Sequence, residues 1–411
     1  MTKLTKDNLF VLVKSLTKSE KRQFKLYVGR LGVNEDSKFL LLFKLLERLK
    51  VYDEKLILKQ GFVKKQQLSN LKAHLYKQIL ISLKLNPSHQ NLRIQLREQL
   101  DFATILYHKG LYKQSLKILD KAKALAIKNQ EKNIAYEIVE LEKVIESQYI
   151  TRSLSNRADA LTIQAKELSR QNVIASKLSN LSLQLYGLFL KTGYVKNNAE
   201  HEKVTDYFDK RMPKFKIEAL GFREKLWLYK SHLWYSFLIQ DFKSCYKYSR
   251  KWVDLFYDNE TMIPLNPVFF LRGYQYLLEA LFFIKHHQKF KNVLNDFEQI
   301  TQKAWFPHDD NIDGLVFLYL YSNKINLHFM EGSFTEGLPL IEEVLEGLKR
   351  HANQIDEHHV MVFYYKIASL YFGTGDYENA IYFLSKIINN KSLQMREDLL
   401  CFTRILNLVA H

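Results

Sequence analysis

Acidic residues cluster in one stretch whose spacing could hold a divalent cation. Asp309, Asp310 and Asp313 have the DDxxD spacing, which could chelate Mg²⁺ together with a diphosphate. The stretch also begins like a calcium-binding loop, but Leu320 stands where such a loop needs a bidentate glutamate. Acidic side chains are equally favourable in the first turn of a helix. The pattern therefore favours a helix N-terminus, and we expect no metal site.

Other patterns that could support catalysis are weaker. The pairs His286–His287 and His358–His359 could suggest a metal, but adjacent residues on a helix point about 100° apart and rarely chelate together. The sequence contains no GxxxxGK[ST] phosphate loop and no GxSxG nucleophile motif. We predict a non-catalytic protein without cofactor or metal, with an all-helical enzyme as an alternative.

The segment 54–84 carries a stronger chemical signal, because it combines a helix-turn-helix layout with a basic, polar face. A short helix at 54–60 precedes Gly61 and a longer helix rich in Lys, Gln and Asn. Lysine binds phosphate, and amide side chains can read adenine edges. The alternative is a helical hairpin with an ordinary solvated face. With a second cluster near residue 20, the candidate basic patch for nucleic acid or an acidic partner is Lys18, Lys21, Arg22, Lys25, Lys64, Lys65, Lys72 and Lys77.

Charge is unevenly distributed along the chain. Residues 1–90 hold 19 Lys and Arg against 7 Asp and Glu, whereas the remainder holds 42 against 37. Such a basic region attracts phosphate backbones, anionic lipid or acidic protein, although a merely solvated surface is the alternative. The two cysteines are far apart, and apolar runs of about five residues are too short for a bilayer span. We expect a cytoplasmic protein with no membrane span.

The elements that position these residues are predicted to be helices throughout. The chain has only 14 Gly and 6 Pro in 411 residues, which favours an all-α fold. Thr17 and Glu20 form a capping box, and Asp53 can cap the short helix that follows it. Asn86-Pro87-Ser88 ends a first helical domain, residues 1–88.

From residue 91 a two-helix pattern repeats. In its clearest copy a helix carries Tyr371, a turn has Gly375, and a second helix begins with Tyr377 and Ala380. These spacings resemble the tetratricopeptide repeat (TPR), which implies a right-handed α-solenoid of antiparallel helix pairs. The turn aromatics recur at 43–48 residues in most steps. We expect about seven pairs over 91–390, one of them near 133–171 without the turn signature, and a capping helix over 393–411.

The resemblance also implies a binding surface. In TPR-like solenoids the first helix of each pair lines the concave groove, where rings supply contact area and polar groups fix the register of a peptide. The alternative is that these aromatics pack within or between the pairs. Matched position by position, the groove residues are Tyr107, Lys230, Trp234, Phe237, Lys285, Asn326, Phe329, Tyr365 and Phe372.

Two non-catalytic functions fit these features. The first is a protein-interaction scaffold whose groove binds a peptide or partner helix. The second is a regulator whose basic N-terminal domain binds DNA, since the layout resembles bacterial peptide-sensing regulators that place a DNA-binding or effector-binding domain before such a solenoid. A protein or peptide partner is expected in either case, with nucleic acid contacting residues 1–90 in the second.

Overall fold

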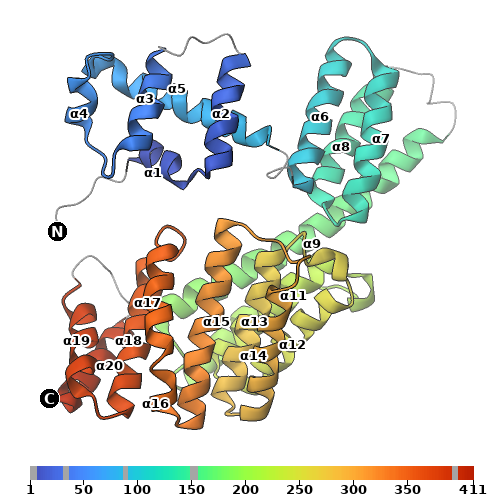
Figure 1. Ribbon diagram of the computed structural model, residues 1–411. Helices are drawn as coiled ribbons and strands as arrows, with labels where there is room; N and C mark the ends of the chain where they lie inside the picture. The colour runs from blue at the N-terminus through green and yellow to red at the C-terminus, as the bar shows by residue number, and fades with distance from the viewer. Residues whose placement is uncertain (1–6, 31–36, 87–90, 149–155, 391–396) are drawn as a thin grey trace. The chain divides into compact units, whose positions relative to one another are not determined.

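The computed structural model describes residues 7–30, 37–86, 91–148, 156–390 and 397–411, and within these ranges the chain is helical, without a β-strand (Figure 1). The all-α prediction is thus confirmed. The chain divides into two compact units, residues 1–105 and 106–411. The predicted domain end at Pro87-Ser88 and the first part of the predicted capping segment, 393–396, lie outside the described residues.

The first unit is a small helical domain with its own apolar core. Phe24, Phe43, Leu46 and Ile57 are fully buried in it. The capping box forms as predicted, because the Thr17 amide donates to Glu20 at 2.7 Å and the Glu20 amide donates back to Thr17 at 3.2 Å. The helices are α1 (Asn8–Ser15), α2 (Lys18–Arg30), α3 (Lys38–Arg48), α4 (Glu54–Lys59) and α5 (Lys65–Lys84), with α6 (Leu92–His108) crossing the boundary between the units.

The second unit is an array in which helices adjacent in sequence pack against each other. It ends with α20, which packs on α18 and α19. The helices are α7 (Tyr112–Lys128), α8 (Lys132–Gln148), α9 (Arg157–Thr192), α10 (Asn198–Arg211), α11 (Phe222–Leu238), α12 (Phe242–Tyr257), α13 (Pro267–Phe283), α14 (His287–Thr301), α15 (Asp310–Glu331), α16 (Phe334–Gly337), α17 (Leu340–Arg350), α18 (Glu357–Gly373), α19 (Tyr377–Ile388) and α20 (Glu397–Ala410), with short 3₁₀ turns at Ile217–Ala219 and Glu260–Met262.

One turn geometry recurs between paired helices. A residue with left-handed backbone ends the first helix. The residue after it donates its backbone amide to the carbonyl of the residue five positions before the donor, at 2.8–3.1 Å, as in a Schellman motif. Glycine suits this conformation, because other side chains crowd the backbone there. The left-handed residues are Gly110, Gln130, Gln240, Lys285, Gly332 and Gly375. We call them the turn residues. The last four are spaced by 45, 47 and 43 positions.

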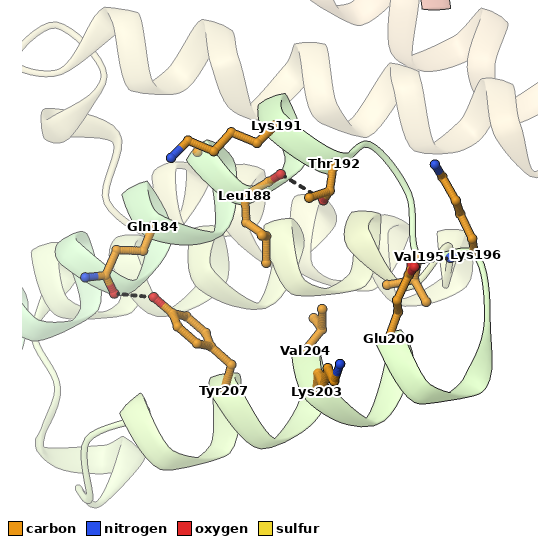
Figure 2. A pocket seen from close by; sticks show the side chains of 11 residues that line it. Gln184, Leu188, Lys191, Thr192, Val195, Lys196, Glu200, Lys203, Val204 and Tyr207 are labelled. Carbon is orange, nitrogen blue, oxygen red and sulfur yellow. Dashed lines mark hydrogen bonds between the residues drawn. The ribbon is translucent and has the colours of Figure 1, made fainter.

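The segment after α8 differs from the predicted pattern. Residues expected to form the second helix of one pair and the first helix of the next are a single helix, α9, of 36 residues. No proline interrupts it, and it ends only where Gly193 adopts φ 69°. Its first part packs on α8, whereas its last part packs with α10 around an open groove (Figure 2). One helix is therefore shared by two successive packing arrangements.

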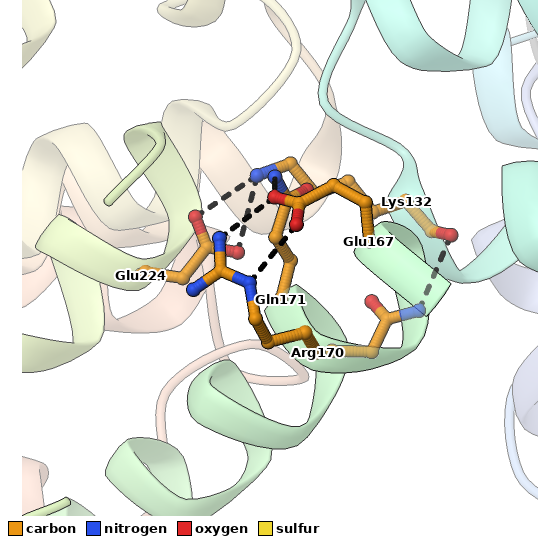
Figure 3. A network of polar contacts seen from close by, with 6 residues as sticks. Lys132, Glu167, Arg170, Gln171 and Glu224 are labelled. Atoms are coloured by element: carbon orange, nitrogen blue, oxygen red, sulfur yellow. Dashed lines mark hydrogen bonds and ion pairs between the residues drawn. The ribbon is translucent and has the colours of Figure 1, made fainter. Parts of the chain in front are cut away.

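Buried charges tie α8, α9 and α11 together. The Lys132 ammonium donates to both Glu224 carboxylate oxygens at 3.0 and 3.2 Å, and both side chains are almost fully buried (Figure 3). Asn172 of α9 donates to the Lys132 carbonyl at 3.3 Å. Close by, the more exposed Arg170 forms hydrogen bonds with Glu167 within α9. The ion pair thus connects helices that are 92 residues apart in sequence.

Candidate functional site

The first helices of successive pairs, α11, α13, α15 and α18, contact one another through one face. Each of these helices ends at a turn residue, and the residues that lie 6, 9, 10 and 13 positions before that turn residue form the shared face. We call it the first-helix face. Rings of α11 and α13 meet there, with Trp227 and Phe269 5.4 Å apart. Its residues are Trp227, Lys230, Ser231 and Trp234 of α11; Arg272, Gln275, Tyr276 and Glu279 of α13; Tyr319, Ser322, Asn323 and Asn326 of α15; and Val362, Tyr365, Lys366 and Ser369 of α18.

Two cations lie together on this face, Lys230 of α11 and Arg272 of α13. The Lys230 ammonium lies 4.9 Å from the centre of the Trp227 ring and 5.9 Å from that of Phe269. Burial, reinforced by the neighbouring Arg272 charge, lowers the pKa of Lys230 to about 8. Among the described residues neither cation forms an ion pair with a carboxylate. The basic pair is therefore partly desolvated and lacks an acidic partner within 4 Å in the described chain.

Hydrogen bonds continue the face across α13, α15 and α18. Asn323, which is fully buried, donates to Gln275 at 2.8 Å. The Lys366 ammonium donates to the Ser322 carbonyl at 3.0 Å and to the side-chain oxygen of Asn326. Burial lowers the pKa of Lys366 to about 7, and the Glu279 charge opposes that shift. These bonds hold the polar side chains in fixed positions, which is what a binding surface needs to select one register of a ligand.

The structure places four of the nine predicted groove residues on the first-helix face. Lys230 and Tyr365 occupy position 10 before their turn residues, and Trp234 and Asn326 occupy position 6. The side chains of Lys230, Asn326 and Tyr365 are half-buried. Burial raises the pKa of the Tyr365 hydroxyl. Asn326 is engaged by Lys366, so it contributes a fixed rather than a free polar group.

Four predicted groove residues have a different role, which corrects the prediction. Each lies three positions before a turn residue and packs its ring on the aromatic residue two positions after that turn. The centroid distances of these pairs are 5.9 Å for Tyr107–Tyr112, 6.4 Å for Phe237–Phe242, 6.2 Å for Phe329–Phe334 and 5.5 Å for Phe372–Tyr377. These aromatics close the turns within helix pairs, which is the alternative that the sequence left open.

Two predicted groove residues need a correction for other reasons: Trp234 lies on the face but is buried, and Lys285 does not lie on the face. Trp234 has only 6% of its surface exposed and is surrounded by the rings of Tyr186, Phe189, Phe237 and Tyr276 at 4.7–5.7 Å. Lys285 is a turn residue with φ 55°, so it lies beyond the end of α13 rather than on its face. Its sequence position was matched to a helix, whereas its backbone ends that helix.

Most residues of the first-helix face are missing from the prediction, among them Trp227, Arg272 and Lys366. The sequence does contain a signal for these three. Each falls 13 or 9 positions before a turn residue, on the same helical face as position 10. For Trp227 and Arg272 the signal is hidden because their turn residues, Gln240 and Lys285, are not glycine, which removes the reference points for counting.

The predicted basic patch of the first unit is only partly free. Lys72 forms an ion pair with Asp7 and donates to the Tyr52 hydroxyl at 3.0 Å, so we remove it from the patch. Lys21 and Lys25 both approach Glu47, at 4.0 and 3.1 Å. The exposed members without an ion pair in the described chain are Lys18, Arg22, Lys64, Lys65 and Lys77.

The acidic stretch at 309–313 is a helix N-terminus, as predicted. The Asp309 carboxylate accepts from the Ile312 amide at 2.8 Å and caps α15, and Asp313 lies 2.8 Å from His308. In the part of the chain that the structure describes, no three His, Cys, Asp or Glu side chains converge as metal ligands would.

Known proteins give no guide to the role of the first-helix face, so its role is inferred from its own chemistry. No family model matches the chain, and no curated protein or solved structure is significantly similar to it. No helix among the described ranges is both long enough and apolar enough to cross a bilayer.

Proposed function

We propose that this chain is a non-catalytic, cytoplasmic interaction scaffold whose first-helix face binds a polypeptide segment containing a carboxylate. The array would be a right-handed, TPR-like solenoid, a proposal supported by the recurrence of one turn geometry at 43–47 residues. The observation that carries the function is the basic pair, Lys230 and Arg272, which lies half-buried beside aromatic rings without a carboxylate partner in the described residues.

The energetics of this pair favour an anionic ligand. Two like charges close together in a partly desolvated setting disfavour each other's ionised form, and a bound carboxylate offsets that repulsion. Guanidinium and ammonium groups form charge-assisted hydrogen bonds with carboxylates, which are about twice as strong as neutral ones. Trp227 and Phe269 add apolar contact area around the charged centre.

A displayed library of random linear peptides selected on the full chain tests the proposal. We expect the recovered peptides to be enriched in Asp or Glu and to lose about tenfold or more in affinity on the double variant Lys230→Met, Arg272→Met. Lys177→Met is the matched control, because it removes an exposed charge from a different helix, α9. Equal recovery by wild type and the double variant, with unchanged helicity, would refute the proposal.

DNA binding through the first unit is a second candidate. The observation that favours it is that Lys64 and Lys65 are exposed at the start of α5, soon after the Gly61 turn, and that neither forms an ion pair in the described chain. Lys77, further along α5, is also exposed and without an ion pair there. Exposed lysines at the start of a helix that follows a tight turn suit phosphate contacts from a helix-turn-helix.

Salt dependence of duplex binding by the full chain tests this candidate. If Lys64 and Lys65 contact phosphates, their joint replacement by Ala should reduce the slope of log affinity against log salt by about 2. Lys177→Ala should leave the slope unchanged. Absence of duplex binding at low salt would eliminate the candidate without affecting the peptide-binding proposal.

A further inference from the structure

A second surface with the properties of a docking site lies on α9 and α10, and no residue of the first-helix face lines it. The last turns of α9, the connection at 193–197 and α10 enclose an open groove of about 790 Å³ (Figure 2). One part of it is bridged by Tyr207, whose hydroxyl donates to the Gln184 side-chain oxygen at 3.0 Å. A space of this volume is large enough to receive several side chains of a partner.

The floor of the groove is apolar and carries a glycine that the fold does not require. Leu188, Val195 and Val204 supply the apolar surface. Gly187 lies inside α9, where glycine costs about 1 kcal/mol relative to alanine. A Cβ atom at Gly187 would meet no atom within 4 Å, so no intramolecular contact explains the missing side chain. The glycine instead leaves the backbone open to close approach from outside.

The rim of the groove is basic. Lys191 of α9, Lys196 of the connection and Lys203 of α10 line it, and none forms an ion pair in the described chain. The lining has one acid, Glu200, whose carboxylate already accepts from the Lys196 amide at 2.9 Å and from Asn197 at 3.3 Å. Three cations surrounding an apolar floor therefore face a single carboxylate, which is already bound by the two residues before α10.

We infer that the α9–α10 groove binds an acidic amphipathic helix of a partner protein, with apolar side chains over Gly187 and carboxylates against the three lysines. Charge complementarity and the apolar floor match the helix-in-groove mode of recognition. Nucleic acid fits less well, because the floor is largely aliphatic and the Arg211 guanidinium lies 3.7 Å from the centre of the Tyr207 ring, where a base would stack. The inference does not depend on the proposed function of the first-helix face.

The test uses the full chain and a displayed library of helical peptides of about four turns, with apolar residues at one helical stripe and Glu or Lys randomised beside it. We expect selection of Glu beside the stripe. Gly187→Leu should lower the affinity of the selected peptides by about tenfold or more, because it fills the floor, while folding is preserved or improved. Lys203→Glu should cause a loss of similar size by charge reversal.

Matched variants distinguish the loss of binding in this groove from general effects of an added leucine or a reversed charge. Gly29→Leu adds the same side chain at another helical glycine with open space, and Lys177→Glu reverses an exposed charge on α9 outside the groove. Both should retain affinity, as should Lys230→Met. Selection of Lys beside the stripe, no enrichment, or equal binding by Gly187→Leu would overturn the inference. Loss of duplex DNA binding in Lys203→Glu, without any peptide selection, would instead assign the groove to nucleic acid.

Discussion

The array from α11 to α19 and the segment from α8 to α10 use different means to hold helices together. In the array, ring pairs close the turns, and aromatic side chains fill the space between helices. In the α8–α10 segment a buried ion pair joins α8 to α11 of the array, and an apolar floor between α9 and α10 is left uncovered. Shape complementarity thus dominates the packing of the first region, and charge pairing is more important in the second. The uncovered apolar floor leaves the second region open to a partner.

Two glycines show the same difference. Gly347 of α17 lies directly against the Phe317 ring, so a Cβ atom there would overlap the ring. At Gly187 of α9 a Cβ atom would meet nothing within 4 Å. Both residues lie inside continuous helices at the same intrinsic cost, but only Gly347 has an internal reason to lack a side chain.

The largest expected effect comes from breaking the buried ion pair between α8 and α11. Glu224→Gln leaves the buried Lys132 ammonium without its counter-charge, which should lower the free energy of unfolding by about 3–5 kcal/mol. Urea denaturation followed by circular dichroism measures the change. Arg170→Gln, which affects the more exposed pair with Glu167, should cost less than about 1 kcal/mol. Equal losses would show that burial of the Lys132–Glu224 pair is not important.

A smaller effect tests the shape complementarity of the array. Gly347→Ala should lower the free energy of unfolding by about 1–3 kcal/mol, because the added methyl group must displace the Phe317 ring. Gly187→Ala should raise it by up to about 1 kcal/mol through helix propensity alone. Denaturation midpoints of the two variants should therefore move in opposite directions, and parallel shifts would contradict the comparison.

Burial of Lys230 in the array makes the free energy of unfolding depend on pH. The pKa of Lys230 is about 8 in the folded chain against 10.5 in the unfolded chain, so the folded state binds fewer protons between these values and its stability rises with pH there. Lys230→Met should therefore stabilise the fold below pH 8 by about 1–2 kcal/mol, after allowance for solvent screening, and the advantage should disappear towards pH 10.5.

Denaturation of wild type and Lys230→Met at pH 7 and about pH 10 measures this difference. Lys177→Met, at an exposed site on α9, should show no comparable pH-dependent advantage. An advantage of Lys230→Met that grows with pH would have the wrong sign for a desolvated cation.

The smallest effect concerns the turns. Lys285→Gly should raise the free energy of unfolding by up to about 1 kcal/mol, since it relieves a left-handed backbone conformation at φ 55°. Gly375→Ala, at the equivalent turn with φ 79°, should lower it by about 1 kcal/mol. If both changes destabilise equally, the two turns are not equivalent.

The helices and several of their ends could be predicted from the sequence, because local chemistry determines them. The capping box at Thr17 and the caps at Asp53 and Asp309 form as the sequence indicates. The candidate site was harder, since it depends on register: without the turn at Lys285, the position of Arg272 on a face cannot be counted.

Contacts distant in sequence were not predictable in the same way. Nothing local to Lys132 indicates that its partner is Glu224, 92 residues away, and nothing local to Gly187 indicates that α10 would form the opposite wall of a groove. The burial of Trp234 is also a property of four neighbouring rings from three helices.

The continuity of α9 restricts how this chain can change length. Each residue of a helix contributes about 100° of rotation and 1.5 Å of rise. Deleting one residue near Ile174 would turn the half of α9 that contacts α10 and α11 by about 100° relative to the half that contacts α8, so that both sets of contacts could not be made at once. Viable insertions in α9 should therefore come in whole multiples of two turns, about seven residues.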